Sequence, residues 1–247
     1  MREILAIGIG AGDPEHMTIA AIRALNAADL VLIPRKGAQK ADLADLRREI
    51  CARYLENPAT RIVEFDMPRR DPDLAYLAAV EAWHAAIAAL WRPLIEAAGP
   101  KARVALLVWG DPSLYDSTLR ILDRLEAGGL VFARRVIPGI TSLQALTARH
   151  AIPLNALAGP VEITTGRRLR EGPPPEGTVA VMLDGDCAFR HLPGADYHIY
   201  WAAYLGLPQE IALAGPLDAM AEAIVAARAE ARARHGWIMD LYLLRRR

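Results

Sequence analysis

The first half of the chain alternates short apolar runs with segments of helical periodicity. The apolar runs predict strands at residues 3–9, 30–34, 61–65, 104–108 and 131–137, and the segments between them predict helices at 18–26, 42–54 and 117–126. Asp71 followed by Pro72 predicts the start of a further, longer helix, and Pro93 predicts its kink or end. Strands that alternate with helices form a largely parallel sheet. We therefore expect an N-terminal α/β domain with five strands and helices on both faces.

The pattern changes after Pro138. Residues 142–149 and 217–234 predict helices, and shorter strands are expected at 161–165, 179–183, 198–204, 211–214 and 237–244. The close spacing permits hairpins and predicts a mixed α+β sheet. The run Pro173 to Pro175 predicts an exposed turn. We expect two domains, residues 1–150 and 151–247, with a cleft between them.

Composition excludes several classes of protein. The chain has 29 basic and 29 acidic side chains, so no net charge attracts it to nucleic acid or to an anionic membrane. No apolar stretch approaches the roughly 20 residues that span a bilayer. Cys51 and Cys187 lie far apart, without metal-ligand spacing, which predicts free thiols and a cytoplasmic location. No metal site is expected.

A glycine-rich loop, Gly8-Ile9-Gly10-Ala11-Gly12-Asp13, follows the first predicted strand. Such a loop lets backbone groups approach a ligand. Its spacing is G-x-G-x-G, and Pro34, Arg35 and Lys36 stand where a dinucleotide-binding fold would place a ribose-binding acid. Dinucleotide binding is therefore disfavoured. A P-loop is disfavoured too, because the sequence lacks G-x-x-x-x-G-K-[ST].

Further loops of this kind follow the fourth and fifth predicted strands. They read Trp109-Gly110-Asp111-Pro112-Ser113-Leu114-Tyr115 and Ile137-Pro138-Gly139-Ile140-Thr141-Ser142. Parallel strands bring their carboxyl ends to one edge of the sheet, where ligands of open α/β sheets bind. The loops therefore predict one binding site at that edge.

In this order and spacing, the loops resemble those of the tetrapyrrole methylase family, the class III methyltransferases. The resemblance covers essentially the whole chain and includes Ile152-Pro153-Leu154, residues 163–167 and 178–183, Gly206-Leu207-Pro208-Gln209, and residues 214–217. Two positions depart from the pattern, because many relatives have proline where Ala11 stands and glycine where Trp109 stands. The resemblance implies a soluble homodimer that uses S-adenosylmethionine and binds a small tetrapyrrole.

Residues 109–118 and 204–210 are most similar to the members that methylate C1 of precorrin-5 and release acetate in cobalamin biosynthesis. Three alternatives stay open at this point. One is another corrin-pathway methyltransferase, such as the enzyme acting at C20, and a more distant one is diphthine synthase. From a different class, the chain could be a non-catalytic tetrapyrrole or nucleotide carrier of the same fold.

Carried over residue by residue, the resemblance implies a set of cofactor contacts: Ala11, Trp109, Gly110, Asp111, Leu114, Thr141, Ser142, Leu183 and Gly206. Glycines suit such a site because a side chain would block contact with the backbone. Thr141 and Ser142 have a second interpretation as helix caps, since Gln144 completes a T-x-x-Q capping box with Thr141.

Methyl transfer from a sulfonium moves positive charge without creating any, so alignment matters more than a strong base. Acetate release, which requires hydration of a ketone and cleavage of a carbon–carbon bond, would benefit from an acid or a base. Asp111, Tyr115 and Asp116 are the candidate catalytic residues, and the lone histidines His84 and His191 are more typical of packing.

The substrate carries many carboxylates, which arginine binds in bidentate fashion. Asp13, Arg35 and Arg167 are the candidate substrate-binding residues. Further cations near the same edge or after a strand are Lys36, Arg69, Arg70 and Arg168. For each of these six lysine and arginine residues, including Arg35 and Arg167, a solvated surface charge is an equally good interpretation.

Overall fold

The computed structural model describes residues 1–35, 41–172 and 176–247. Lys36 and the predicted turn at Pro173 to Pro175 lie outside the described residues. The chain forms two compact units, one of Met1–Gly10 with Pro14–Ile140 and one of Ala11–Asp13 with Thr141–Arg247. The predicted boundary between residues 150 and 151, with a cleft between the two domains, stays a prediction.

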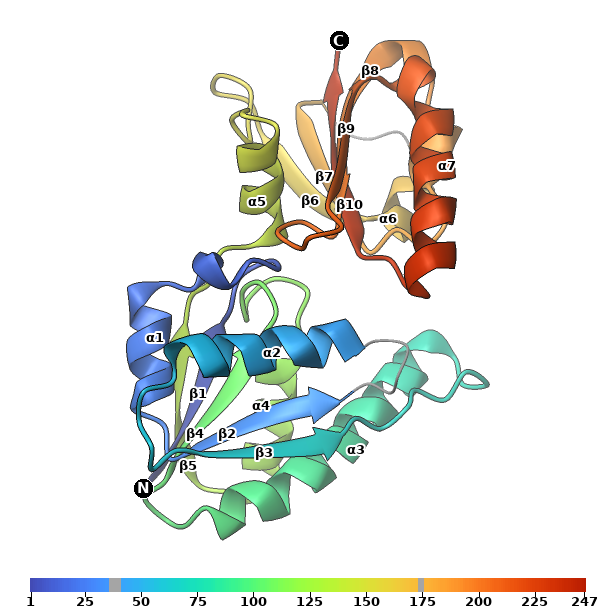
Figure 1. Ribbon diagram of the computed structural model, residues 1–247. Helices are drawn as coiled ribbons and strands as arrows, with labels where there is room; N and C mark the ends of the chain where they lie inside the picture. Colours follow the sequence, from blue (N-terminus) through green and yellow to red (C-terminus); the bar gives the residue numbers. More distant parts are fainter. Residues whose placement is uncertain (36–40, 173–175) are drawn as a thin grey trace. The chain divides into compact units, whose positions relative to one another are not determined.

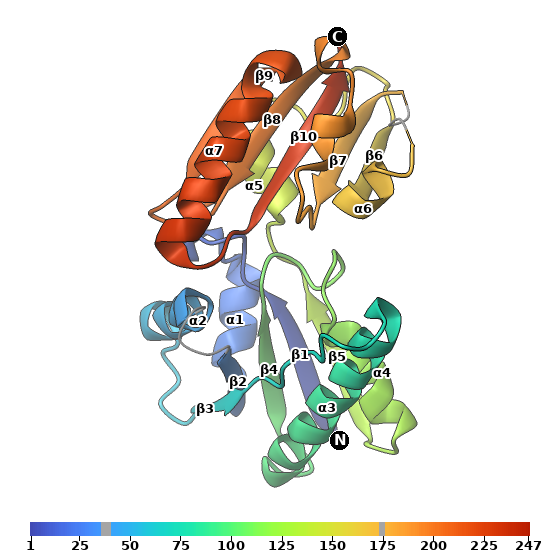
Figure 2. The ribbon, with the colours of Figure 1, turned by 90° about the vertical axis from the view of Figure 1, so that its right-hand side faces the viewer.

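The first unit is a parallel sheet with helices on both faces, as predicted (Figures 1 and 2). The strand order is β3-β2-β4-β1-β5, and every neighbouring pair is parallel. Its strands are β1 (Arg2–Gly8), β2 (Leu30–Arg35), β3 (Arg61–Asp66), β4 (Arg103–Val108) and β5 (Phe132–Ile137). Its helices are α1 (Ile19–Asn26), α2 (Ala41–Tyr54), α3 (Tyr76–Ala97) and α4 (Thr118–Ala127), with a short 3-10 helix at Pro14–His16.

Alternation along the strands builds a core on each face of this sheet. In β2, Val31 and Ile33 pack with α1 and α2, whereas Leu30 and Leu32 pack on the opposite face with α3 and α4. Successive side chains of a strand point to opposite faces, so a continuous apolar run is what a sheet covered on both sides requires. This is why the apolar runs located the strands correctly.

The start of α3 was predicted wrongly. The helix begins at Tyr76, not at Asp71 and Pro72, and it continues through Pro93 to Ala97. The carboxylate of Asp71 instead accepts a hydrogen bond of 2.9 Å from the backbone N–H of Asp73. An aspartate can satisfy local backbone groups in a turn as readily as at a helix start, and here the turn is formed.

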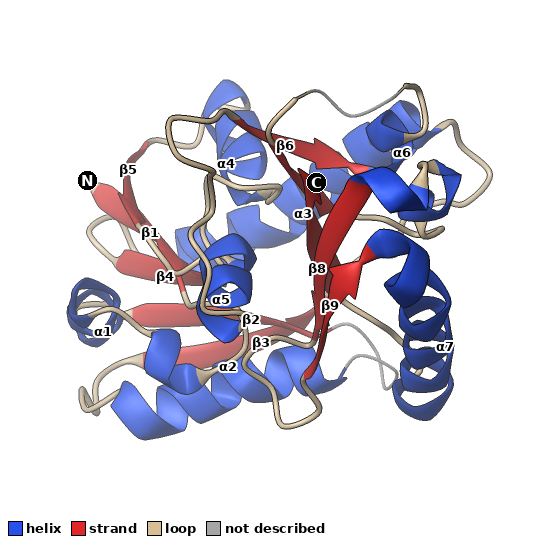
Figure 3. Ribbon diagram, turned by 90° about the horizontal axis from the view of Figure 1, so that it is seen from above, coloured by secondary structure: helices blue, strands red, loops and turns tan. Residues whose placement is uncertain are grey.

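The second unit is a mixed sheet in the order β6-β7-β10-β8-β9, with one parallel pair, β6 and β7. Its strands are β6 (Val161–Thr165), β7 (Thr178–Met182), β8 (Tyr197–Ala203), β9 (Ile211–Pro216) and β10 (Asp240–Arg246). Helices α5 (Ser142–Arg149) and α7 (Leu217–His235) lie on opposite sides of this sheet (Figures 1 and 3). This confirms the predicted mixed α+β organisation.

The sequence missed a helix, α6 (Gly166–Leu169), and placed the start of the last strand too early. β10 begins at Asp240, because Gly236 ends α7 in a left-handed conformation and Trp237 packs edge-on against the ring of Tyr204. Cys51 and Cys187 are free, as expected, and both are buried. Within the described ranges, no helix has the length and apolar character needed to cross a bilayer.

Candidate active site

The three loops at the carboxyl ends of β1, β4 and β5 meet through their backbones. Gly10 and Gly110 form an antiparallel bridge, in which the N–H of Gly110 donates to the carbonyl oxygen of Gly10 at 2.8 Å. A Cβ atom on Gly139 would lie 2.2 Å from the carbonyl oxygen of Gly110, and one on Gly8 would lie 2.5 Å from the N–H nitrogen of Gly139. Only glycine permits this approach, so the predicted convergence of these loops is confirmed.

Their position is a topological switch point of the sheet. β1 and β4 are adjacent, yet α1 after β1 and α4 after β4 pack in the cores on opposite faces. Loops that leave neighbouring strands in opposite directions open a crevice at the carboxyl edge, where ligands of open α/β sheets bind.

The side chain of Asp111 joins two of these loops. One carboxylate oxygen accepts a hydrogen bond of 2.8 Å from the N–H of Gly139, and the other accepts bonds from the N–H and the hydroxyl of Ser113 at 2.8 and 2.5 Å. Burial opposes ionisation, but these hydrogen bonds outweigh it and lower the pKa of Asp111. The residue is therefore an ionised clamp that fixes the shape of the loops.

Tyr115 and Asp116 follow in the same loop. Tyr115 has φ of 49°, a conformation that L-residues rarely adopt, and its side chain is 44% exposed. The carboxylate of Asp116 accepts a hydrogen bond of 2.7 Å from the N–H of Thr118 at the start of α4. Strained backbone with an exposed polar side chain is common where ligands bind.

Arg47 of α2, which the sequence did not single out, is buried close to the charge of Asp116. It donates a hydrogen bond of 2.9 Å from its Nε to the carbonyl oxygen of Leu107 in β4. Burial lowers the pKa of Arg47 to about 10, although the nearby charge of Asp116 acts in the opposite direction. Arg47 remains a cation and supports the carboxyl end of β4 from below.

His84 on α3 is also buried, and its Nε2 atom has no hydrogen-bond partner among the described residues. Burial, and then the charges of Arg120 and Arg70, lower the pKa of His84 against the opposing charge of Asp116. The neutral ring packs beside Trp83, with ring centres 5.7 Å apart. This environment agrees with the packing interpretation of His84.

The remaining predicted residues of the first unit make packing, hydrogen-bond or ion-pair contacts within the protein. Trp109 packs against the core beneath α1 and α2, and the N–H of Leu114 donates to the carbonyl oxygen of Asp111 at 3.3 Å. Arg35, at the end of β2, forms an ion pair of 3.0 Å with Asp66. Its charge is already matched by a carboxylate of this chain.

In the second unit, the segment Ala11–Asp13 packs against the loop that follows β8. A Cβ atom on Gly206 would lie 2.5 Å from the backbone nitrogen of Asp13. Gly206 has φ of 77°, and its N–H donates to the carboxylate of Glu210 at 2.8 Å. The structure thus places Asp13 beside Gly206, and Ala11 belongs to the same short segment of the second unit.

Thr141 and Ser142 lie at the start of α5. The Thr141 hydroxyl accepts a hydrogen bond from the N–H of Gln144, and the Gln144 side chain accepts one of 2.8 Å from the N–H of Thr141. The predicted capping box is confirmed, and its role in binding stays a prediction. Arg167 lies exposed in α6, in the second unit, whereas Arg35 belongs to the first.

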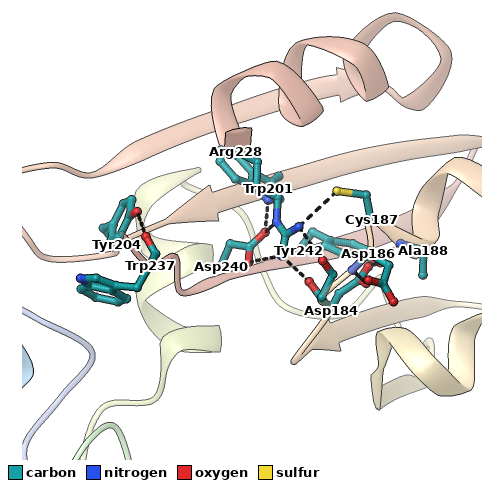
Figure 4. A network of polar contacts seen from close by, with 11 residues as sticks. Asp184, Asp186, Cys187, Ala188, Trp201, Tyr204, Arg228, Trp237, Asp240 and Tyr242 are labelled. Carbon is teal, nitrogen blue, oxygen red and sulfur yellow. Dashed lines mark hydrogen bonds and ion pairs between the residues drawn. The ribbon is translucent and has the colours of Figure 1, made fainter. Parts of the chain in front are cut away.

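Leu183 stands directly after β7 with φ of 54°, and 64% of its surface is exposed. A leucine rarely adopts this conformation. The residue after it, Asp184, is buried in a polar network with Arg228, Asp240 and Tyr242 (Figure 4). The sequence missed this network. A signal was present for Asp184, since an aspartate followed by Gly185 after a strand favours a turn, but nothing distinguished Arg228 from the other arginines of its helix.

The family comparison agrees with this geometry. Residues 3–221 match the model of the Tetrapyrrole (Corrin/Porphyrin) Methylases. The chain belongs to this family of methyltransferases.

Among individual relatives, precorrin-6A synthase [deacetylating] of Sinorhizobium sp. is 54% identical over 250 residues, which cover all of this chain and 96% of that protein. A crystal structure of a cobalamin synthesis related protein (CobF) of Corynebacterium diphtheriae is similar over 99% of this chain and 98% of that one, with a TM-score of 0.85 and 38% identity.

More distant relatives share less. Siroheme synthase of Pseudomonas paraeruginosa is 31% identical over 153 residues, and this chain spans only 28% of its length. Uroporphyrin-III C-methyltransferase of Thermus thermophilus, solved with S-adenosylhomocysteine bound, covers 98% of this chain at 18% identity and a TM-score of 0.58. The second likeness shows the fold alone.

Proposed function

We propose that this chain transfers a methyl group from S-adenosylmethionine to C1 of precorrin-5 and releases acetate, giving precorrin-6A in cobalamin biosynthesis. The observation that carries the proposal is 54% identity, over the whole chain, to a deacetylating precorrin-6A synthase. The alternatives are not favoured. The full-length identity to a deacetylating precorrin-6A synthase favours that activity over a C20 methyltransferase or diphthine synthase, and a carrier would not need the loop geometry of a methyltransferase.

The residues predicted to contact the cofactor suit S-adenosylmethionine, which carries a sulfonium cation, an apolar base and groups that hydrogen-bond to backbone. Gly110 and Gly206 adopt left-handed conformations without a side chain, with φ of 69° and 77°. Leu183 presents an exposed apolar side chain. None of the predicted cofactor contacts is a cation, so none repels the sulfonium. The set also includes Ala11, Trp109, Asp111, Leu114, Thr141 and Ser142.

When bound, the cofactor supplies the methyl group, and the protein supplies orientation. Asp111 holds the loops after β4 and β5 together through its hydrogen bonds to Ser113 and Gly139. A site fixed before binding lets the reacting atoms meet without a further loss of entropy, an effect on the order of 7 to 11 kcal/mol at best. Rigid backbone is therefore the main contribution that we assign to this chain in methyl transfer.

Acetate release needs a group that can donate or accept a proton near the substrate. Of the candidates, Asp111 already uses both carboxylate oxygens within its own loops. Tyr115 is 44% exposed, in a strained loop at the carboxyl edge of the sheet. We therefore favour Tyr115, with Asp116 beside it, for the deacetylation step.

We further propose that Asp13, Arg35 and Arg167 contact the tetrapyrrole. Arginine binds carboxylates in bidentate fashion, which suits a substrate with many acidic side chains. Because Arg35 is paired with Asp66, it would have to exchange this partner for the substrate. We also propose a homodimer in the cytoplasm, which light scattering and cell fractionation would test.

The decisive experiment incubates the purified protein with S-adenosylmethionine and a reconstituted supply of precorrin-5. Product mass reports methylation, and an enzymatic assay reports acetate. Both products are expected from the wild type. Tyr115→Phe should lose most acetate release and, with it, most methylation of the ring carbon whose electron pair the cleavage frees, whereas Asp123→Ala, a surface change on α4, should keep both. A methylated product without acetate from the wild type would contradict the deacetylating assignment.

A further inference from the structure

The loop after β7 is held in an unusual conformation. Leu183 and Cys187 both have left-handed backbones, with φ of 54° and 58°. Neither is a glycine, so each position costs free energy that the surrounding structure must supply. Leu183 is also exposed, so packing of its own side chain does not explain the conformation.

The carboxylate of Asp184 holds this loop from inside. Its two oxygens accept hydrogen bonds of 3.0 Å from the N–H of Asp186 and 2.6 Å from the N–H of Ala188. The second oxygen also accepts a bond of 2.6 Å from the hydroxyl of Tyr242. Burial, and then the charge and hydrogen bond of Asp184, raise the pKa of Tyr242, so this hydroxyl stays protonated and donates.

Arg228 holds the same loop from the other side (Figure 4). Its guanidinium donates to the carbonyl oxygens of Asp184 and Gly185 at 2.5 and 2.9 Å, and to the sulfur of Cys187 at 3.5 Å. Burial alone would lower the pKa of Arg228, but the hydrogen bonds and charge of Asp240 outweigh it and raise the pKa. The ion pair with Asp240 is 2.8 Å long and almost completely buried.

Apart from Asp184 itself, the side chains of the network come from regular elements and not from the loop. Tyr242 and Asp240 lie in β10, Arg228 lies in α7, and Trp201 in β8 donates to Asp240 at 2.9 Å. Every residue from Asp184 to Ala188 therefore has a hydrogen bond that ties it to this network. The sheet and its helix impose the loop conformation.

We propose that Tyr242, Asp184 and Arg228 are positioning residues for cofactor binding, which hold the loop after β7 so that Leu183 presents its side chain to S-adenosylmethionine. This inference rests on the proposed function. In the free protein, the network holds the backbone of Leu183 in its strained left-handed conformation. The cofactor therefore binds to a loop that is already ordered. Loss of one hydrogen bond in the network lets Leu183 relax to an ordinary conformation, and binding must then restore it.

Tyr242→Phe is the sharpest test, because it removes one hydroxyl and leaves the buried ring. The dissociation constant of S-adenosylhomocysteine is measured by titration calorimetry at a temperature well below the unfolding transition. We expect it to rise about tenfold. Ile224→Val is the matched control, since it also trims a buried side chain of the second unit, on the helix that carries Arg228. It should leave the dissociation constant unchanged.

A double-mutant cycle tests whether Tyr242 affects cofactor binding through the conformation of Leu183. Glycine adopts a left-handed backbone without strain, so Leu183→Gly removes the need for the network to hold this residue. In that background, Tyr242→Phe should weaken binding by less than about twofold. An undiminished tenfold effect would overturn the route through Leu183.

The outcomes separate this inference from the proposed function. If the wild type binds S-adenosylhomocysteine and Tyr242→Phe binds it equally well, the network is only structural and the inference is wrong, while the proposed function stands. If the wild type does not bind, both are overturned. Asp184→Asn provides a second variant should Tyr242→Phe not fold. Its dissociation constant for S-adenosylhomocysteine should also rise about tenfold, and unchanged binding would overturn the inference.

Discussion

The carboxylate of Asp111 accepts a hydrogen bond from the backbone N–H of Gly139, across the end of the strand that separates their loops. β1 lies between β4 and β5 in the sheet, so the 2.8 Å bond closes over its carboxyl end at Gly8. A single side chain thereby fixes the spacing of the loops that follow β4 and β5.

Replacement of Asp111 by alanine should weaken cofactor binding without unfolding the protein. The N–H of Gly139 and the groups of Ser113 lose their acceptor, so we expect unfolding free energy to fall by about 1–3 kcal/mol and the dissociation constant of S-adenosylhomocysteine to rise at least tenfold. Chemical denaturation and titration calorimetry measure the two effects. Asp123→Ala, which breaks an exposed ion pair with Arg134, should change stability by less than about 0.5 kcal/mol. Unchanged binding by the Asp111 variant would remove this residue from the site.

Stability should depend on pH through the same carboxylate. The pKa of Asp111 is lower in the folded protein than its ordinary value of 3.8, so its stabilising contribution is complete above that value and is lost as the pH falls through the lowered pKa. The difference in unfolding free energy between wild type and Asp111→Asn should be constant above about pH 5 and shrink toward about pH 3. Urea denaturation of both proteins across this range measures it. A difference that grows on acidification would mean that the carboxylate is not ionised in the folded state.

Gly139→Ala adds only one methyl group, yet it should destabilise the folded protein strongly. The added methyl group would overlap the carbonyl oxygen of Gly110 and force the loops apart, at a cost of about 1–3 kcal/mol. Gly172→Ala is the control, because a Cβ atom there meets no atom within 4 Å. Thermal unfolding of the two variants compares them directly, and equal melting temperatures would show that the loops can separate freely.

Leu183→Gly should change stability and binding in opposite directions. Relief of the left-handed strain should raise the unfolding free energy by up to about 1 kcal/mol, since the exposed side chain contributes little to the core. Loss of the apolar contact should raise the dissociation constant of S-adenosylhomocysteine about tenfold. If calorimetry finds binding intact, Leu183 does not contact the cofactor.

The sheet of the first unit could be predicted because most residues of strands such as β2 are buried, and a run of apolar side chains indicates this burial directly. The convergence of the glycine loops followed from the rule that parallel strands end at one edge. The helix start at Asp71 could not be resolved, because the same carboxylate can cap a helix or close a turn.

The polar contacts within the site were beyond prediction for a different reason. The carboxylate of Asp111 can accept a hydrogen bond from the N–H of Gly139 only once the sheet has brought the two loops together. In the sequence, Arg228 does not differ from the other arginines of α7, and only the fold buries it against Asp240. Burial of a charged residue depends on tertiary partners, and no local pattern encodes those.

The segment Ala11–Asp13 follows the first strand, but it packs with the second unit, against the loop that contains Leu205 and Gly206. A ribosome releases this segment long before its packing partner, because Leu205 and Gly206 lie much later in the sequence. The first unit can therefore form its sheet while translation continues, but the loop that follows its first strand cannot adopt its final packing until Leu205 and Gly206 have emerged. Packing of Ala11–Asp13 is thus a late step in the folding of a newly made chain, later than formation of the sheet that this segment follows.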